Sequence, residues 1–130
     1  MKMEHALHNE LLCDHLLEQG TYYDWVLTTA FYSALHFVNH QLFPFTYNGN
    51  SYANFDLYYD AEIINKKGPK MSKHAATIDL VSNHLIACYS PYKNLYDMCM
   101  TSRYNNYHVT KAKASKARSY LSAVKNCCSK

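Results

Sequence analysis

The segment 22–42 constrains the fold most, because apolar side chains recur there on nearly every side of a helix. A helix that is apolar on most sides lies in the middle of a bundle, where neighbouring helices cover its faces. Ser33, His36 and Asn39 interrupt the run, which makes it too polar to span a membrane. We therefore expect the central helix of a soluble protein without membrane association. The apolar positions are Trp25, Val26, Leu27, Ala30, Phe31, Ala34, Leu35, Phe37, Val38 and Leu42.

Two other segments carry apolar residues at helical spacing. The first covers residues 4–18, and Gly20 follows it at the position where glycine commonly ends a helix. Ser72 is suited to cap a third helix, whose apolar residues continue as far as Cys88. The expected apolar face of the first helix consists of Leu7, Leu11, Leu12, His15 and Leu16.

Two more helices are predicted toward the C-terminal end. Ser90-Pro91 is expected to start the fourth, because proline is tolerated in the first helical turn. Thr110 is expected to cap the last helix, whose buried stripe consists of Ala114, Ala117, Leu121 and Val124. No segment shows the alternation of a β-strand. The chain is therefore predicted to be all-α, an antiparallel four- to five-helix bundle that forms one domain over residues 1–130.

A long connection is expected at about residues 44–70. Pro44 ends the helix before it, and turn signals occur at Asn48-Gly49 and Gly68-Pro69. The aromatic residues of this connection indicate that it packs against the bundle, and a short helix fits residues 52–64.

The cysteines are odd in number and lack CxxC spacing. Four acidic residues stand among the first twenty, so no secretory signal is expected and the protein is predicted to be cytoplasmic. Cytosolic cysteines are normally reduced, so we expect free thiols and no zinc site built from them. The five are Cys13, Cys88, Cys99, Cys127 and Cys128.

Charge is unevenly distributed along the chain, whose net charge is +3. No acidic residue follows Asp97, whereas seven lysines and arginines do. A basic C-terminal part beside an acidic body suits a phosphate backbone or an acidic protein partner. A solvated helix face would have the same composition.

The segment 95–108, LYDMCMTSRYNNYH, gathers more candidate functional side chains than any other part of the chain. It holds an arginine, two amides, three tyrosines and a histidine. Tyr104 and Tyr107 precede the basic last helix, and tyrosines can stack on unpaired bases. In a small helical protein, tyrosines also fill the edge of the core.

The central segment DWVLTTAFYSALHFVNHQL and the run LYDMCMTSRYNNYHVTKAKASKARSYLSAV resemble the HEPN superfamily, helical domains often associated with RNA cleavage and with nucleotidyltransferase partners. The resemblance covers residues 22–124 without the long loop. It rests on a YxALH pattern, a Ser-Lys-His before the third helix, an LY…RY block and an alanine-rich last helix. It implies a HEPN-like fold, a homodimer, and RNA processing or a partner role in a toxin–antitoxin or defence system.

Active members of that superfamily have an arginine followed at short distance by a histidine, and Arg103 and His108 fit this spacing. The resemblance implies a metal-independent endoribonuclease without a cofactor. Arg103 would hold the scissile phosphate and stabilise its developing charge. His108 would transfer the proton of the ribose 2′-hydroxyl or of the leaving group, and Asn105 or Asn106 would orient the RNA backbone.

A second alignment of the same block places Cys99 at the position of the arginine of the superfamily, and Tyr104 at that of its histidine or tyrosine. A thiol offers no fixed positive charge to a phosphate, so this alignment implies a catalytically degenerate domain that binds RNA or a protein partner. The expected binding residues are Tyr104, Tyr107, Lys111, Lys113, Lys116 and Arg118.

A metal site is a further alternative. His36 and His40 lie one turn apart on the central helix, and such a pair binds Zn²⁺ or iron when another helix supplies a third ligand. His84 or His15 is the candidate for that ligand. In the other interpretation, His36 is a hydrogen-bonded core residue and His40 lies at the surface.

Overall fold

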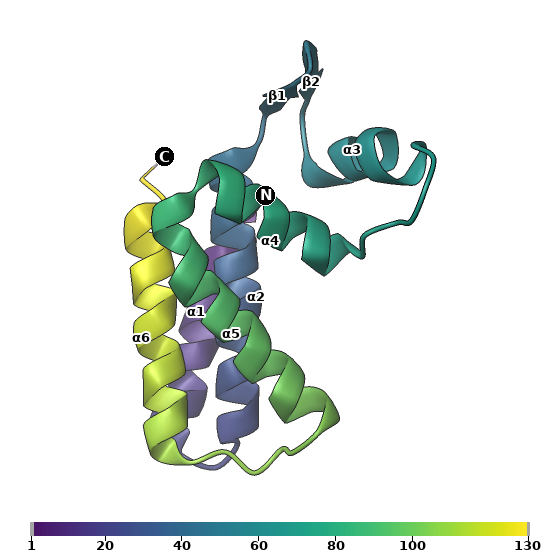
Figure 1. Cartoon of the computed structure of the whole chain (residues 1–130). Coiled ribbons are helices and arrows are strands. Elements are labelled where there is room, and N and C mark those ends of the chain that lie inside the picture. The colour runs from purple at the N-terminus through teal and green to yellow at the C-terminus, as the bar shows by residue number, and fades with distance from the viewer. Residues whose placement is uncertain (1, 130) are drawn as a thin grey trace.

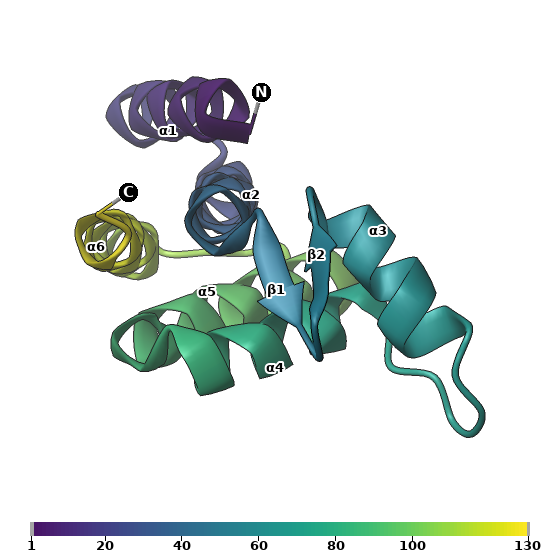
Figure 2. The ribbon, with the colours of Figure 1, turned by 90° about the horizontal axis from the view of Figure 1, so that it is seen from above.

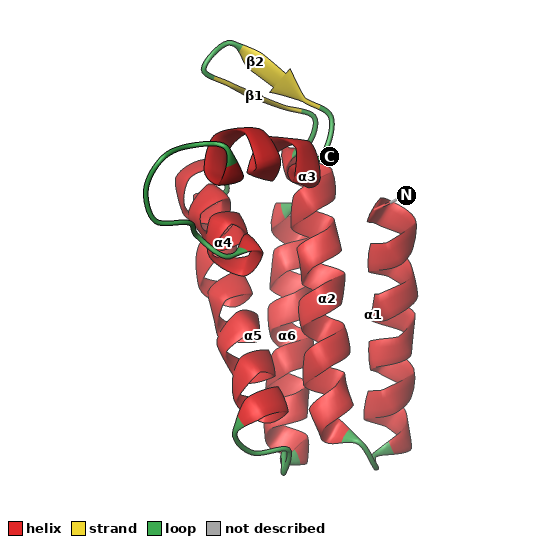
Figure 3. Cartoon of the chain, turned by 90° about the vertical axis from the view of Figure 1, so that its right-hand side faces the viewer, coloured by secondary structure: helices red, strands yellow, loops and turns green. Residues whose placement is uncertain are grey.

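The computed structural model describes residues 2–129, and this part of the chain is mostly helical. Four long helices lie side by side as a bundle (Figure 1) and a smaller unit sits across one end of it (Figure 3). The long helices are α1 (Lys2–Gln19), α2 (Tyr23–Leu42), α5 (Ile86–Tyr104) and α6 (Lys111–Cys127). The smaller unit contains β1 (Phe45–Tyr47), β2 (Asn50–Tyr52), α3 (Phe55–Tyr59), a π-helical turn (Asp60–Ile64) and α4 (Lys73–His84).

Helix α2 is the central helix, as its sequence predicts. Seen from above in Figure 2, it lies between α1 and α6 on one side and α5 on the other. Val26, Ala30 and Phe31 are fully buried. Trp25 is an exception, because it lies at the start of α2 with 54% of its surface exposed. None of the described helices is both long enough and apolar enough to cross a membrane.

Small side chains bring α1 close to α2. Ala6 and Cys13 are fully buried, and the buried Ser33 hydroxyl donates to the Ala6 carbonyl at 2.7 Å. The predicted apolar face of α1 is therefore displaced, because the two small residues permit a close approach that leucines would block. Leu7 and Leu11 lie on the outer side, 42% and 63% exposed.

The predicted helix ends are confirmed where capping residues define them. The Ser72 and Thr110 hydroxyls each accept a backbone N–H three residues later at 3.1 Å, and Gly20 follows α1 with a φ of +77°. Each cap satisfies an N–H group that would otherwise have no partner in the first turn. The four residues of the predicted α6 stripe are fully buried.

The predicted boundary between the third and fourth helices is wrong. Helix α4 ends at His84 and α5 begins at Ile86, so Pro91 lies inside α5 rather than at its start. The chain bends at Leu85, whose side chain packs against both apolar clusters of the molecule. Pro91 is the sixth residue of α5 and has no N–H, so the helix lacks one backbone hydrogen bond there.

The connection contains a hairpin that sequence periodicity did not indicate. Strands β1 and β2 pair with Tyr47 opposite Asn50, and Asn48 and Gly49 form the turn with φ of +50° and +81°. These angles match the tight turn that an Asn-Gly pair favours. Three-residue strands are too short to show alternation. The connection packs down as expected, on a second cluster that includes Leu42, Phe43, Phe55, Tyr58, Tyr59, Ala76 and Leu80.

Two of the cysteines form a disulfide, which corrects the expectation of free thiols. Cys88 lies near the start of α5 and Cys127 ends α6, and their Cα atoms are 5.9 Å apart. The two helices are antiparallel, so the start of one meets the end of the other although 39 positions separate the two cysteines.

Candidate functional site

The segment 95–108 forms the second half of α5 and most of the loop before α6 (Figure 1). Leu95 and Cys99 are fully buried, whereas the chain is exposed from Arg103 to His108. The backbone N–H groups of Asn105 and Asn106 both donate to the Thr101 carbonyl, at 2.9 and 3.0 Å. These bonds end the helix and hold both amide residues at the beginning of the loop.

Arg103 has aromatic neighbours and no carboxylate partner among residues 2–129. Its Nη1 donates to the hydroxyl of Tyr32 on α2 at 3.0 Å. The guanidinium lies 5.3 Å from the centre of the Tyr104 ring, within the range of a cation–π contact. Asp24 lines the same surface hollow as Arg103, but no ion pair joins the two side chains within residues 2–129.

His108 adjoins a different part of the surface. Its backbone N–H donates to Asn106 Oδ1 at 2.9 Å, and its ring lies 4.2 Å from that of Tyr107. His108 lines a hollow with Asn106 and Lys113 among others, whereas Arg103 lines another with Trp25 and Tyr107. Ser102 borders both hollows. The structure thus places the two candidate catalytic residues near each other on the chain but in separate hollows.

His74, at the start of α4, is a histidine whose pKa depends on Arg103. Burial, and then the positive charge of Arg103, lower the pKa of His74 below its ordinary value. The His74 ring packs 5.5 Å from those of Phe31 and Tyr96. The Ser-Lys-His that opens this helix is part of the resemblance, but nothing in the sequence indicates the proximity of His74 to Arg103.

Cys99 lies in the core beside these groups. Its sulfur is 3.9 Å from the hydroxyl oxygen of Thr28 on α2, and burial raises the pKa of its thiol. A buried, protonated thiol cannot bind a phosphate, so the functional groups on this face are those of the residues around it.

Trp25 was expected in the core but contributes to the surface. It lines the same hollow as Arg103, Thr28 and Tyr107. Tyr104 and Tyr107 are 71% and 65% exposed. Three large aromatic side chains are thus presented around one guanidinium. The apolar pattern of α2 gave no sign of this, because Trp25 fits the helical spacing of buried positions.

The basic residues of α6 divide into two groups. Lys111, Lys113 and Lys116 are exposed and form no ion pair within the described part of the chain, although Lys116 lies 5.3 Å from the Tyr120 ring. Arg118, by contrast, is bound to acidic residues of α1.

The Arg118 guanidinium is 23% exposed and holds α6 against α1. Its Nη2 donates to Glu10 at 3.0 Å, and its Nε donates to Asp14 at 2.5 Å. Lys125 also pairs with Glu10, at 2.9 Å. The assignment of Arg118 to nucleic-acid binding is therefore corrected, because its donors are occupied inside the protein.

The histidines proposed as metal ligands have separate environments. The His36 ring packs against that of His5 at 5.0 Å, and the His84 ring against that of Phe45 at 5.0 Å. His36, His40 and His84 do not form a cluster of metal-ligating atoms within residues 2–129, and neither does His15 with any of them. A cluster that does form there consists of Cys88, Cys127 and Cys128.

No model of a known protein family matches the chain, and neither the curated proteins nor the solved structures include a significant match.

Proposed function

We propose that the chain binds single-stranded RNA through a surface at the end of the bundle where α5 passes into α6. This surface, called the α5–α6 surface below, consists of Trp25, Arg103, Tyr104, Tyr107, Lys111 and Lys113. The observation that carries the proposal is an arginine without a carboxylate partner in the described chain, set among three exposed aromatic rings.

Single-stranded RNA offers the two chemical features that this surface fits. Its phosphates attract unneutralised cations, and its unpaired bases stack on aromatic rings. The lysines at the start of α6 extend the positive charge. Two acidic residues border it: Asp24 lines the hollow of Arg103, and Asp97, which pairs with Lys93 at 2.7 Å, lines the hollow of Lys113. A basic patch alone would bind any polyanion, but aromatic rings within it favour a ligand with unpaired bases.

The geometry favours binding over cleavage. A nuclease of the Arg–His type needs both side chains on one phosphodiester. Arg103 and His108 line adjoining hollows that share Ser102, and the Arg103 guanidinium is bonded to Tyr32 on α2 rather than directed to His108. We therefore propose a catalytically degenerate RNA-binding or partner module. A homodimer and a nucleotidyltransferase-like partner stay predictions from the HEPN resemblance.

The test is fluorescence anisotropy with a labelled, unstructured RNA of about twelve nucleotides. Replacing Tyr104 and Tyr107 together with alanine removes two stacking platforms of about 1–3 kcal/mol each, so affinity should fall at least about tenfold. Arg103→Gln should weaken binding and make the logarithmic salt dependence shallower by about 0.7, the contribution of one phosphate contact on a single strand.

Matched controls lie at the other end of the bundle. Tyr47 in the hairpin is 37% exposed, and Lys70 lies in the exposed loop before α4. Tyr47→Ala and Lys70→Gln should leave affinity unchanged. An equal loss in the controls, or no binding at low salt, would refute the proposed surface.

The same RNA, analysed on a denaturing gel, distinguishes binding from catalysis. We expect it to remain intact without added metal. Cleavage that disappears in both Arg103→Gln and His108→Ala would show instead that the two residues act together as a nuclease.

A further inference from the structure

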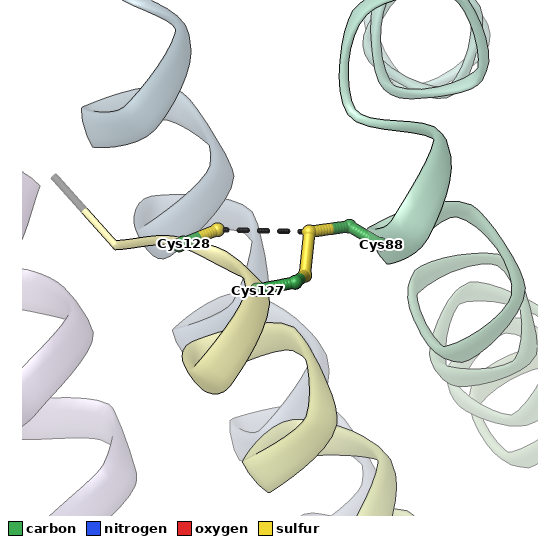
Figure 4. Close-up of side chains that lie close together, drawn as sticks. All are labelled: Cys88, Cys127 and Cys128. Atoms are coloured by element: carbon green, nitrogen blue, oxygen red, sulfur yellow. Dashed lines mark hydrogen bonds between the residues drawn. A yellow bond between two sulfur atoms is a disulfide. The ribbon is translucent and has the colours of Figure 1, made fainter.

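Three cysteine sulfur atoms meet at the end of the bundle opposite the α5–α6 surface (Figures 1 and 4). Cys88 is the third residue of α5, Cys127 is the last of α6, and Cys128 follows it. All three sulfur atoms lie within 4.8 Å of one another. This is the one group of three metal-ligating side chains within residues 2–129. Cys88 belongs to the bundle core, Cys127 and Cys128 pack against its edge, and none of the three is part of the proposed RNA surface.

One distance within this cluster matches the separation of two ligands on a metal ion. A disulfide joins Cys88 to Cys127, and the Cys128 thiol lies 3.9 Å from the Cys88 sulfur. Two thiolates bound to one Zn²⁺ at about 2.3 Å in tetrahedral geometry are about 3.8 Å apart. The Cys88–Cys128 separation is therefore already that of two sulfur ligands on one ion. Opening the disulfide frees the third sulfur.

We propose that the reduced protein binds one Zn²⁺ through the thiolates of Cys88, Cys127 and Cys128, and that the disulfide is the metal-free, oxidised form of the same site. A covalent bridge between α5 and α6 requires two cysteines, so it does not account for the third. Three sulfur ligands without a neighbouring carboxylate select a thiophilic ion.

Burial gives the site an inner and an outer side. Cys88 is 1% exposed, whereas Cys127 and Cys128 are partly exposed. Zn²⁺ held by three protein ligands usually takes water as its fourth, and the partly exposed side of the cluster admits one.

Loading the site requires reduction of the disulfide. A phosphine supplies the two electrons, water supplies two protons to the sulfurs and its oxygen to the phosphine, and the products are two thiols and a phosphine oxide. When Zn²⁺ binds, the three thiols each lose their proton to solvent as the zinc–sulfur bonds form.

The experiment compares metal binding by phosphine-reduced and oxidised protein. Native mass spectrometry should find one Zn²⁺ per reduced chain and none on the oxidised chain. Co²⁺ should give thiolate-to-metal charge-transfer absorption that Zn²⁺ abolishes at one equivalent. Cys128→Ser keeps the disulfide pair intact and should weaken zinc binding at least about 100-fold, because loss of groups that merely support a ligand already costs 10- to 100-fold.

Cys13 and Cys99 provide matched controls, because both are buried free cysteines outside the cluster. Cys13→Ala and Cys99→Ala, checked for folding by circular dichroism, should bind zinc as the wild type does. Equal zinc binding by oxidised protein, unchanged affinity in Cys128→Ser, or binding of Cu⁺ but not Zn²⁺ would each overturn the proposal. RNA binding is measured separately at the opposite end of the bundle, so either proposal can fail without the other.

Discussion

Replacing Tyr92 with phenylalanine is expected to stabilise the protein. Tyr92 lies in α5 with none of its surface exposed, packed 5.6 Å from the Phe31 ring. Its hydroxyl has no hydrogen-bond partner within the described chain, and burial strongly raises its pKa. The ring contributes to the core, but its oxygen has been removed from water without a replacement bond.

The magnitude follows from the cost of burying an unsatisfied polar group, which is about 1–3 kcal/mol. Removing the oxygen leaves a small void whose lost contacts offset part of that gain. We expect the free energy of unfolding to rise by about 1 kcal/mol. At about 2.1 cal/mol/K per residue, the unfolding entropy of 130 residues makes this a rise in Tm of about 4 °C.

Tyr59 is the matched control, because it is also buried but its hydroxyl donates to the Met71 carbonyl at 2.6 Å. Tyr59→Phe removes a satisfied hydrogen bond and should lower the free energy of unfolding by about 1 kcal/mol. Urea and thermal unfolding, followed by circular dichroism, measure both variants. A loss of stability in Tyr92→Phe equal to that in Tyr59→Phe would refute the reasoning, since it would show that the Tyr92 hydroxyl is satisfied.

Three further substitutions test the electrostatic features. Arg118→Gln should lower the free energy of unfolding in urea by about 1–2 kcal/mol, because partial burial strengthens the bonds of Arg118 to α1. Lys93→Gln breaks an exposed ion pair and should lower it by less than about 0.5 kcal/mol. Equal losses in the two variants would contradict this reasoning. Burial, and then Arg103, lower the pKa of His74 below 6.5 in the folded protein, so the unfolded chain binds more protons and stability should fall as the pH drops below about 6.5. His74→Gln should flatten this decline, and an unchanged slope would contradict it.

The helices could be predicted from sequence because their signals are local. Capping by Ser72 and Thr110 involves residues three positions apart, and the apolar residues of α2 are those that a central helix requires. The bend at Leu85 could not be predicted in this way. Leu85 packs against both apolar clusters, and the second of them forms only when the hairpin and α3 fold onto the bundle. Local sequence preference predicted a helix boundary at Pro91, but tertiary packing places the boundary at Leu85.

In the candidate site, too, local sequence predicts some features, whereas others depend on contacts between residues far apart in the chain. Exposure of Tyr104 and Tyr107 follows from their place at the end of a helix and in a loop, which local sequence indicates. The partners of Arg118 lie more than a hundred positions away in α1, and those of the cysteine cluster about forty positions apart. Charge and spacing therefore indicated candidate residues, but not which of them are already bonded to other side chains within the protein.

Both alignments of the 95–108 block are compatible with a guanidinium beside Cys99 when the direction of helical side chains is considered. Side chains of a helix point back toward its N-terminus, so the Arg103 guanidinium extends over the preceding turn of α5, where Cys99 lies. It is close enough to the Cys99 sulfur for its charge to oppose the rise in pKa that burial causes. The Arg103 guanidinium therefore lies beside Cys99, although the backbone of Arg103 lies one turn further along α5. The bond to Tyr32 turns the Arg103 charge toward α2 and His74, away from the hollow of His108. Positive charge beside Cys99, turned away from His108, is the arrangement on which the proposed RNA-binding surface rests.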